Sequence, residues 1–287
     1  MKKRVVYFIR GIIGILLKIV CILGFTFRVV PKKLDKNSGV VVSLTSYGRR
    51  IRKTVPYTIY YLYFQKTMPS RIILWLDKRK WNKENIPSKL KFLCNHGLEI
   101  QFCDDIRSYT KLIYTLKLCP NNEIVTIDDD IIYSRKLLYE LVYYHKQAPQ
   151  KVISMRYHKP SWEVYGESLI PYNEWNKISN TNDIQIFPTG VGGVLYPPNC
   201  FSEEVFNKDV FLKICPLADD VWFWAMEILK GTKVVGVGKL LYFPMNSFFQ
   251  KLHKGASLQQ LNVGSFENDK QIRAVLDYYK LWNKLTN

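Results

Sequence analysis

The chain has 287 residues, of which 47% are hydrophobic and 14% aromatic. This is enough apolar material for a folded domain with a buried core, and it excludes a disordered or low-complexity chain. The 42 Lys and Arg residues outnumber the 24 Asp and Glu residues, which gives a net charge of +18. Such an excess favours a polyanionic partner, namely nucleic acid, an anionic membrane surface or a phosphorylated substrate.

The positive charge is distributed unevenly. Residues 1–36 hold nine basic residues and one acidic residue. Residues 5–27 are apolar except for Arg10 and Lys18, and their longest uncharged run is nine residues, whereas a spanning helix needs about 20 apolar residues. At about 100° per residue, Lys3 shares one helical stripe with both of these cations. The pattern predicts a basic amphipathic helix that lies in the headgroup region of an anionic leaflet.

Two alternatives remain for this segment: a tilted spanning anchor with snorkelling cations, and a basic helix packed on its own domain. We expect residues 1–36 to form a membrane-associating segment and linker, and residues 37–287 to form the globular domain. The six cysteines form no CxxC pair, which favours a reducing compartment. The predicted location is therefore the cytoplasmic face of the cell membrane.

The globular part alternates short apolar runs with helical stretches. Strands are predicted at 39–46, 71–77, 98–105 and 123–131, and helices at 54–65, 87–96 and 107–119. Strands separated by helices imply βαβ units and a parallel sheet. The expected fold class is α/β.

Polar residues follow each of these strands. The first ends in Thr45-Ser46-Tyr47-Gly48-Arg49, the second in Asp77, the third in Asp104-Asp105 and the fourth in Asp128-Asp129-Asp130. In an open α/β sheet, ligands bind outside the carboxyl ends of the strands. The sequence therefore predicts one ligand-binding crevice at this edge of the sheet, although Asp77 alone is also typical of a solvated loop.

The aspartate triplet is the strongest chemical signal in the chain. Three adjacent negative charges cost free energy unless a cation neutralises them. Oxygen ligands suit Mg²⁺ or Mn²⁺, which commonly bridge to substrate phosphates. The alternative is a solvated acidic turn.

Two further motifs lie downstream. Thr189-Gly-Val-Gly-Gly193 would let a backbone approach a sugar ring closely, or would form an ordinary turn. Asp219 and Asp220 open a predicted helix that ends at Gly231. One of the two would serve as the N-cap, and two together exceed what capping requires.

The chain resembles the GT-A class of nucleotide-sugar glycosyltransferases, in particular the bacterial enzymes of capsule and cell-surface polysaccharide synthesis. The resemblance depends on VVSLTSYGRR (41–50), IVTIDDDIIY (124–133), PTGVGGVLYPP (188–198), ADDVWFW (218–224) and FENDKQI (266–272). It implies a Rossmann-like parallel nucleotide-binding half followed by a mixed acceptor-binding half. The implied activity is that of a hexosyltransferase-type enzyme that uses Mn²⁺ or Mg²⁺.

The resemblance also implies roles for individual residues. Asp128 and Asp130 correspond to the DxD motif that holds the metal and the nucleoside diphosphate, and His253 would be a third metal ligand from a carboxy-terminal loop. Asp219 or Asp220 would be the general base, with Asp220 preferred. Lys111 would turn a cation toward base or phosphate, or would be a solvated helical lysine. The remaining donor-binding candidates are Thr45, Ser46, Tyr47, Arg49, Asp77, Asp104, Asp129, Gly192 and Gly193.

The expected function is metal-dependent transfer of a sugar from a nucleoside diphosphate sugar to a saccharide acceptor, with inversion. A lipid-linked acceptor would explain the amino-terminal segment, and nucleic acid becomes the least favoured partner. The alternatives are a metal-dependent phosphohydrolase, because clustered aspartates also build two-metal sites, and a membrane-bound polyanion-binding protein.

Overall fold

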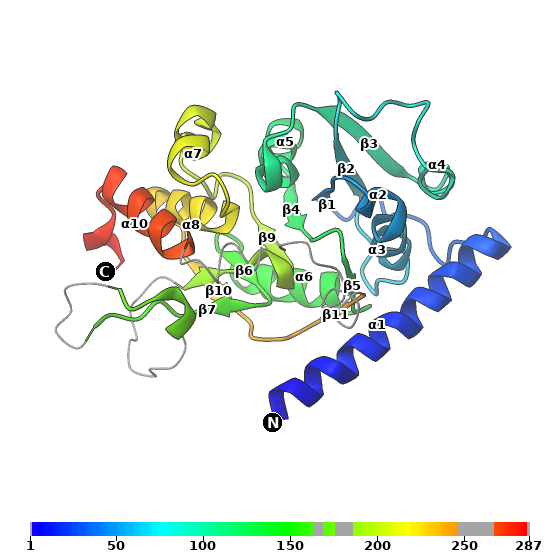
Figure 1. Ribbon diagram of the computed structural model, residues 1–287, viewed down its shortest axis with the longest axis horizontal. Helices are drawn as coiled ribbons and strands as arrows, with labels where there is room; N and C mark the ends of the chain where they lie inside the picture. Colours follow the sequence, from blue (N-terminus) through cyan, green and yellow to red (C-terminus); the bar gives the residue numbers. More distant parts are fainter. Residues whose placement is uncertain (1, 164–168, 176–185, 246–266, 286–287) are drawn as a thin grey trace.

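A computed structural model describes residues 2–163, 169–175, 186–245 and 267–285 (Figure 1). The centre of the fold is a seven-stranded sheet in the order β10-β6-β9-β4-β1-β2-β3. Its strands are β1 (Val40–Thr45), β2 (Arg71–Asp77), β3 (Leu98–Cys103), β4 (Glu123–Thr126), β6 (Val152–Ser154), β9 (Val194–Tyr196) and β10 (Val234–Gly236).

The sheet has a parallel half and a mixed half. Strands β1 to β4 pair in parallel, whereas β9 runs antiparallel to both β4 and β6, and β10 is parallel to β6. The expected α/β fold class is confirmed, and so is the division of the sheet into a parallel half followed by a mixed half. Two small antiparallel pairs accompany the sheet: β5 (Ile131–Tyr133) with β11 (Tyr242–Pro244), and β7 (Tyr157–His158) with β8 (Phe187–Pro188).

Helices cover both faces of the sheet (Figure 1). One hydrophobic cluster packs under α3, α4 and α6, and a second packs under α5, α8 and α10. The helices are α1 (Lys2–Phe27), α2 (Arg50–Lys53), α3 (Val55–Leu62), α4 (Ser88–Cys94), α5 (Thr110–Leu118), α6 (Leu137–Gln147), α7 (Lys208–Ile214), α8 (Asp219–Lys230) and α10 (Glu267–Tyr278).

The third and fourth strands are shorter than predicted. Strand β3 ends at Cys103 and β4 at Thr126, so the aspartates that follow them lie in loops. After β4 the chain forms one more sheet hydrogen bond, from the Ile127 amide to the Ser43 carbonyl at 3.1 Å. It then turns through the triplet into β5, and the Asp129 side chain accepts hydrogen bonds from Ser46 and Arg50.

The predicted amino-terminal helix is present, and the contacts of its basic stripe agree with the alternative of a basic helix packed on its own domain. Arg10 donates to the carbonyls of Leu240 and Tyr242, and Lys18 lies 4.9 Å from the Tyr57 ring centroid. The stripe therefore faces the domain. It can do so because Gly14 lies between the two cations and Cys21 follows them on the same helical stripe, and the helix approaches the domain closely at these small residues.

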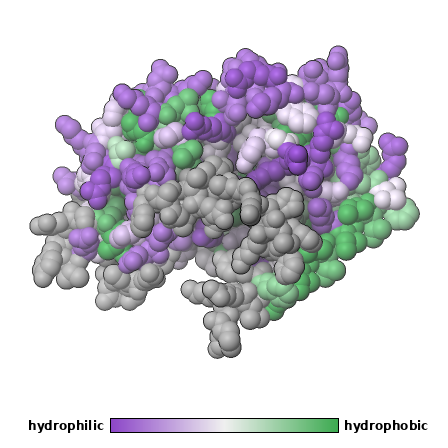
Figure 2. All heavy atoms as spheres, viewed as in Figure 1, coloured by the Kyte–Doolittle hydropathy of each residue, from purple (hydrophilic) through white to green (hydrophobic). Residues whose placement is uncertain are grey.

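Small residues bring α1 against the domain at several turns. A Cβ at Gly14 would clash with the Pro244 carbonyl, and a Cβ at Gly24 would clash with the Tyr60 hydroxyl. Cys21 is fully buried. The opposite face of α1 is apolar and exposed (Figure 2). Within the described residues, one helix is long and apolar enough to cross a membrane by length and composition, at 8–27 with a mean hydropathy of 2.3.

Candidate active site

Asp129, the middle residue of the triplet, fixes the aspartate loop in place. It is 5% exposed, accepts a hydrogen bond from the Ser46 hydroxyl and lies 2.7 Å from Arg50 Nη1. Its carbonyl accepts from Thr58 Oγ1 at 3.0 Å. Burial raises the pKa of Asp129, although Arg50 and Ser46 oppose this rise by stabilising the carboxylate. The Asp129 side chain therefore points into the protein, whereas the side chains of Asp128 and Asp130 on either side of it are more exposed.

Lys111 connects this loop to the start of α8. Its amine lies 3.4 Å from Asp128 Oδ1 and 3.1 Å from Asp219 Oδ2. The lysine is 7% exposed. Burial alone would lower its pKa, but the charges of Asp219 and Asp128 raise the pKa above its ordinary value. A buried ammonium therefore lies between two carboxylates that come from distant parts of the sequence.

Asp220 is held beside the glycine turn. Its Oδ2 accepts the Gly190 amide hydrogen at 3.0 Å. A Cβ at Gly190 would lie 2.9 Å from Asp220 Oδ1 and 3.2 Å from the Lys111 amine, so a larger residue here would displace these charged groups. Burial, together with the charge of Asp219, raises the pKa of Asp220 to about 7.

The remaining strand-end residues lie at the same edge of the sheet but make separate contacts. Thr45 Oγ1 donates to the Trp75 carbonyl at 3.1 Å. Asp77 pairs with Arg79 at 3.2 Å, and Asp104 is exposed and pairs with Lys78 at 2.9 Å. Tyr47 and Arg49 are exposed. Asp77 ends β2 and Asp104 follows β3, so at least one strand separates each of them from β4 and the aspartate loop.

The glycines predicted to approach a sugar are required by the protein's own packing. A Cβ at Gly192 would lie 2.6 Å from Arg156 Cβ, and Gly193 has φ = 89° with Leu137 against it. The glycine beside the charged groups is Gly190. His253 lies outside the described residues.

Sequence reasoning missed several residues that organise the site. Arg50 pairs with Asp129 and lies 3.7 Å from Asp130 Oδ2. The Tyr133 hydroxyl accepts the Asp128 amide hydrogen at 2.9 Å and donates to the Val191 carbonyl at 3.2 Å. Arg50 and Tyr133 both lie within motifs on which the resemblance depends. The sequence therefore marks these two positions, but it does not show which residues their side chains contact.

The site offers two carboxylates to a divalent cation. The Asp128 side chain is 33% exposed and that of Asp130 is 19% exposed, and both supply the hard oxygen ligands that Mg²⁺ and Mn²⁺ prefer. No group of three His, Cys, Asp or Glu side chains in the described part of the chain is arranged to hold a metal ion. Two carboxylates fit an ion that takes its other ligands from substrate phosphates and water.

No protein-family model matches the chain, and no curated protein matches it. Among solved structures, it is similar to the crystal structure of S. aureus TarS 1-349 in complex with UDP, with 12% sequence identity and a TM-score of 0.43. The match covers 71% of this chain and 59% of that chain, which is less than two thirds of its length. The function has to be inferred from the geometry of the site itself.

Proposed function

We propose that the chain is a glycosyltransferase of the hexosyltransferase type, which moves a sugar from a nucleoside diphosphate sugar to a saccharide acceptor in surface polysaccharide synthesis. The observation that carries the proposal is the position of the Lys111 amine, 3.4 Å from Asp128 and 3.1 Å from Asp219. This buried contact joins the aspartate loop at the end of β4 to the two aspartates at the start of α8. The proposed diphosphate site and the candidate base therefore belong to one group of charged side chains.

Asp220 is the proposed general base. The acceptor hydroxyl oxygen attacks the anomeric carbon, the bond from that carbon to the diphosphate oxygen breaks, and the hydroxyl proton passes to the Asp220 carboxylate. A base that receives the proton from the acceptor in a single displacement gives inversion. A pKa of about 7 suits this role, because proton transfer is most effective when the pKa of the base is near the working pH.

Asp128 and Asp130 are the proposed protein ligands of Mn²⁺ or Mg²⁺. When bound, such an ion would neutralise the charge that develops on the leaving diphosphate. Asp129 positions both ligands through Ser46 and Arg50. The positive charge of Lys111 compensates the negative charges of Asp219 and Asp128 while the donor is absent.

The proposed location is the cytoplasmic face of the cell membrane, with a lipid-linked saccharide as acceptor. The support is the exposed apolar face of α1, on which Phe8, Leu16 and Leu23 are 53%, 56% and 51% exposed. The contacts of Gly14 and Gly24 with the domain lie ten residues apart, or about 15 Å along the helix. A helix docked over this length would lie in the membrane plane, since crossing the bilayer would break these contacts.

Thermal unfolding with added nucleotide tests the donor site. UDP or GDP with Mn²⁺ should stabilise the wild type, by about 2.7 kcal/mol at a ligand concentration 100 times Kd. The D128N/D130N variant should lose the part of this shift that depends on Mn²⁺, and D209N, at an exposed position on α7, should keep it. A shift with oligonucleotides and none with any nucleotide would contradict the proposal and favour a polyanion-binding protein.

A further inference from the structure

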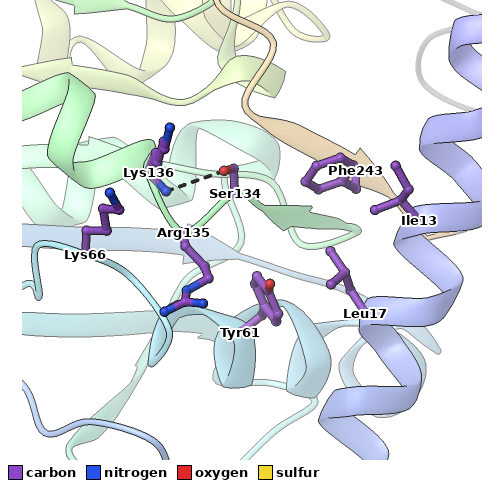
Figure 3. Close-up of a pocket in the computed structure, with 8 residues that line it drawn as sticks. All are labelled: Ile13, Leu17, Tyr61, Lys66, Ser134, Arg135, Lys136 and Phe243. Atoms are coloured by element: carbon purple, nitrogen blue, oxygen red, sulfur yellow. Dashed lines mark hydrogen bonds between the residues drawn. The ribbon is translucent and has the colours of Figure 1, made fainter.

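A pocket of about 420 Å³ lies between α1 and the start of α6 (Figure 3). Its apolar lining comes from Ile13 and Leu17 on α1, Phe243 on β11 and Tyr61 on α3. Lys66, Arg135, Lys136 and Ser134 line the rest. In Figure 3 the three cations lie on the side away from α1, whereas Ile13, Leu17 and Phe243 gather beside it.

The backbone around the cations is fixed by hydrogen bonds. The Lys66 amide donates to the Arg135 carbonyl at 2.7 Å, and the Gln65 side chain donates to the Ser134 carbonyl at 2.8 Å. Arg135 Nε also donates to the Phe64 carbonyl at 3.2 Å. Two segments far apart in the sequence are thereby held together, and none of the eight lining residues is acidic. The lining therefore carries three positive charges and no negative charge, which favours an anionic ligand.

The apolar part of the pocket is continuous with the exposed face of α1. Ile13 and Leu17 are partly buried at the pocket, and the adjacent Ile12 and Leu16 are 44% and 56% exposed. A molecule with its anionic group at Lys66 would therefore direct an attached hydrocarbon chain along α1. A free anion would leave the apolar part unfilled.

We infer that this pocket binds the phosphate group of a single anionic lipid, with the hydrocarbon chain of that lipid against Ile13, Leu17 and Phe243. The charge complementarity and the continuity with α1 both point to an amphiphile. The inference does not depend on sugar transfer. It is nevertheless relevant to the active site, because Ser134 follows Asp130 by four residues through strand β5, or roughly 13 Å of extended chain.

The test measures binding of the full-length chain to vesicles of phosphatidylcholine, with and without phosphatidylglycerol. The wild type should prefer the anionic vesicles, and K66Q/R135Q/K136Q should lose at least about tenfold of this preference, since each cation near an anionic surface contributes a factor of about five. The matched control is K208Q/K213Q/K284Q, which removes three exposed lysines from elements that lie away from α1 (Figure 1). An equal loss in both variants, or in neither, would overturn the inference.

Two further arms separate the sources of the phosphate and the need for a chain. Phosphatidylcholine vesicles that contain a polyprenyl phosphate should also bind the wild type more tightly than the pocket variant. Preference for the polyprenyl phosphate alone would assign the pocket to a lipid-linked substrate, and equal preference would assign it to membrane phospholipid. Monomeric dihexanoylphosphatidylglycerol should bind in calorimetry and inorganic phosphate should bind far more weakly. Equal binding of the two would overturn the role of the apolar lining.

Discussion

The Lys111 amine on α5 lies 3.1 Å from Asp219 Oδ2 at the start of α8. Helix α5 leads into β4 of the parallel half of the sheet, whereas α8 leads into β10 of the mixed half. Both side chains are largely buried, and the same amine also lies 3.4 Å from Asp128. The contact therefore couples the proposed donor site to the proposed base. It is also part of what holds the two halves of the fold together.

Replacing Lys111 with methionine should destabilise the fold. The change leaves Asp219 buried without its cation, and breaking a buried ion pair in this way costs about 3–5 kcal/mol. Urea unfolding followed by circular dichroism measures the loss. Lys117→Met, at an exposed position on the same helix, should cost less than about 1 kcal/mol, and equal losses in the two variants would contradict the structural role of Lys111.

The rate of sugar transfer should follow the ionisation of Asp220. Because the base must be deprotonated and its pKa in the free protein is about 7, kcat/KM should rise about tenfold per pH unit below pH 7 and level off above it. Initial rates at donor concentrations below KM give this profile, and Asp209→Asn serves as the exposed control. A flat profile, or an Asp220→Asn variant with the rate of the wild type, would exclude Asp220 as the base.

The exposed leucines of α1 should control membrane binding. The variant L16Q/L23Q removes two side chains from the apolar face and should weaken binding to anionic vesicles about 30-fold, equivalent to about 2 kcal/mol of lost burial. Co-sedimentation measures the effect. Leu118 on α5 and Tyr278 on α10 are 44% and 57% exposed away from α1, so the control variant L118Q/Y278Q should bind as the wild type does. If both pairs behaved alike, α1 would not be the membrane-binding element.

Glu227 on α8 should make stability depend on pH. It is fully buried, neither of its carboxyl oxygens has a hydrogen-bond partner within the described residues, and burial raises its pKa well above the ordinary value. The folded state therefore holds this proton more tightly than the unfolded state. Stability is fully present below the unfolded pKa of about 4.3 and is lost as the pH rises from there toward the folded pKa.

Glu227→Gln should remove that dependence. Its stability relative to the wild type should increase with pH above about 4.3, by up to about 1.4 kcal/mol per pH unit. Thermal unfolding of both proteins from pH 4 to pH 9 measures the difference. Glu203→Gln, at an exposed position, should track the wild type, and a pH-independent difference for Glu227→Gln would show that Glu227 is ionised in the folded protein.

The parts of the fold that could be predicted are those encoded by local pattern. Helix α8 begins at Asp219 and ends before Gly231, as expected, because Gly231 adopts the left-handed conformation with φ = 86° that ends many helices. The four strands of the parallel half were predicted from their apolar runs. The contact of Lys111 with Asp219 was not predicted, since it depends on where the later elements β9 and α8 pack relative to α5.

The orientation of α1 shows where pattern was insufficient. Gly14 and Cys21 share the helical stripe of Arg10 and Lys18, and their small size lets this stripe pack on β11 and α3. Arg10 and Lys18 then contact carbonyls and aromatic rings of the domain instead of lipid headgroups. The charges alone would indicate that this stripe faces lipid. The small residues Gly14 and Cys21 on the same stripe indicate instead a helix face that packs on protein.

Mass analysis of products tests the central proposal most directly. The full-length chain is incubated with Mn²⁺, a panel of nucleoside diphosphate sugars and lipid-linked saccharides, beside D220N and the exposed control D209N. The wild type and D209N should add one sugar to an acceptor and release one nucleoside diphosphate, whereas D220N should bind the donor without transfer. Release of free sugar with no acceptor product, or transfer by D220N at the rate of the wild type, would contradict the proposed function.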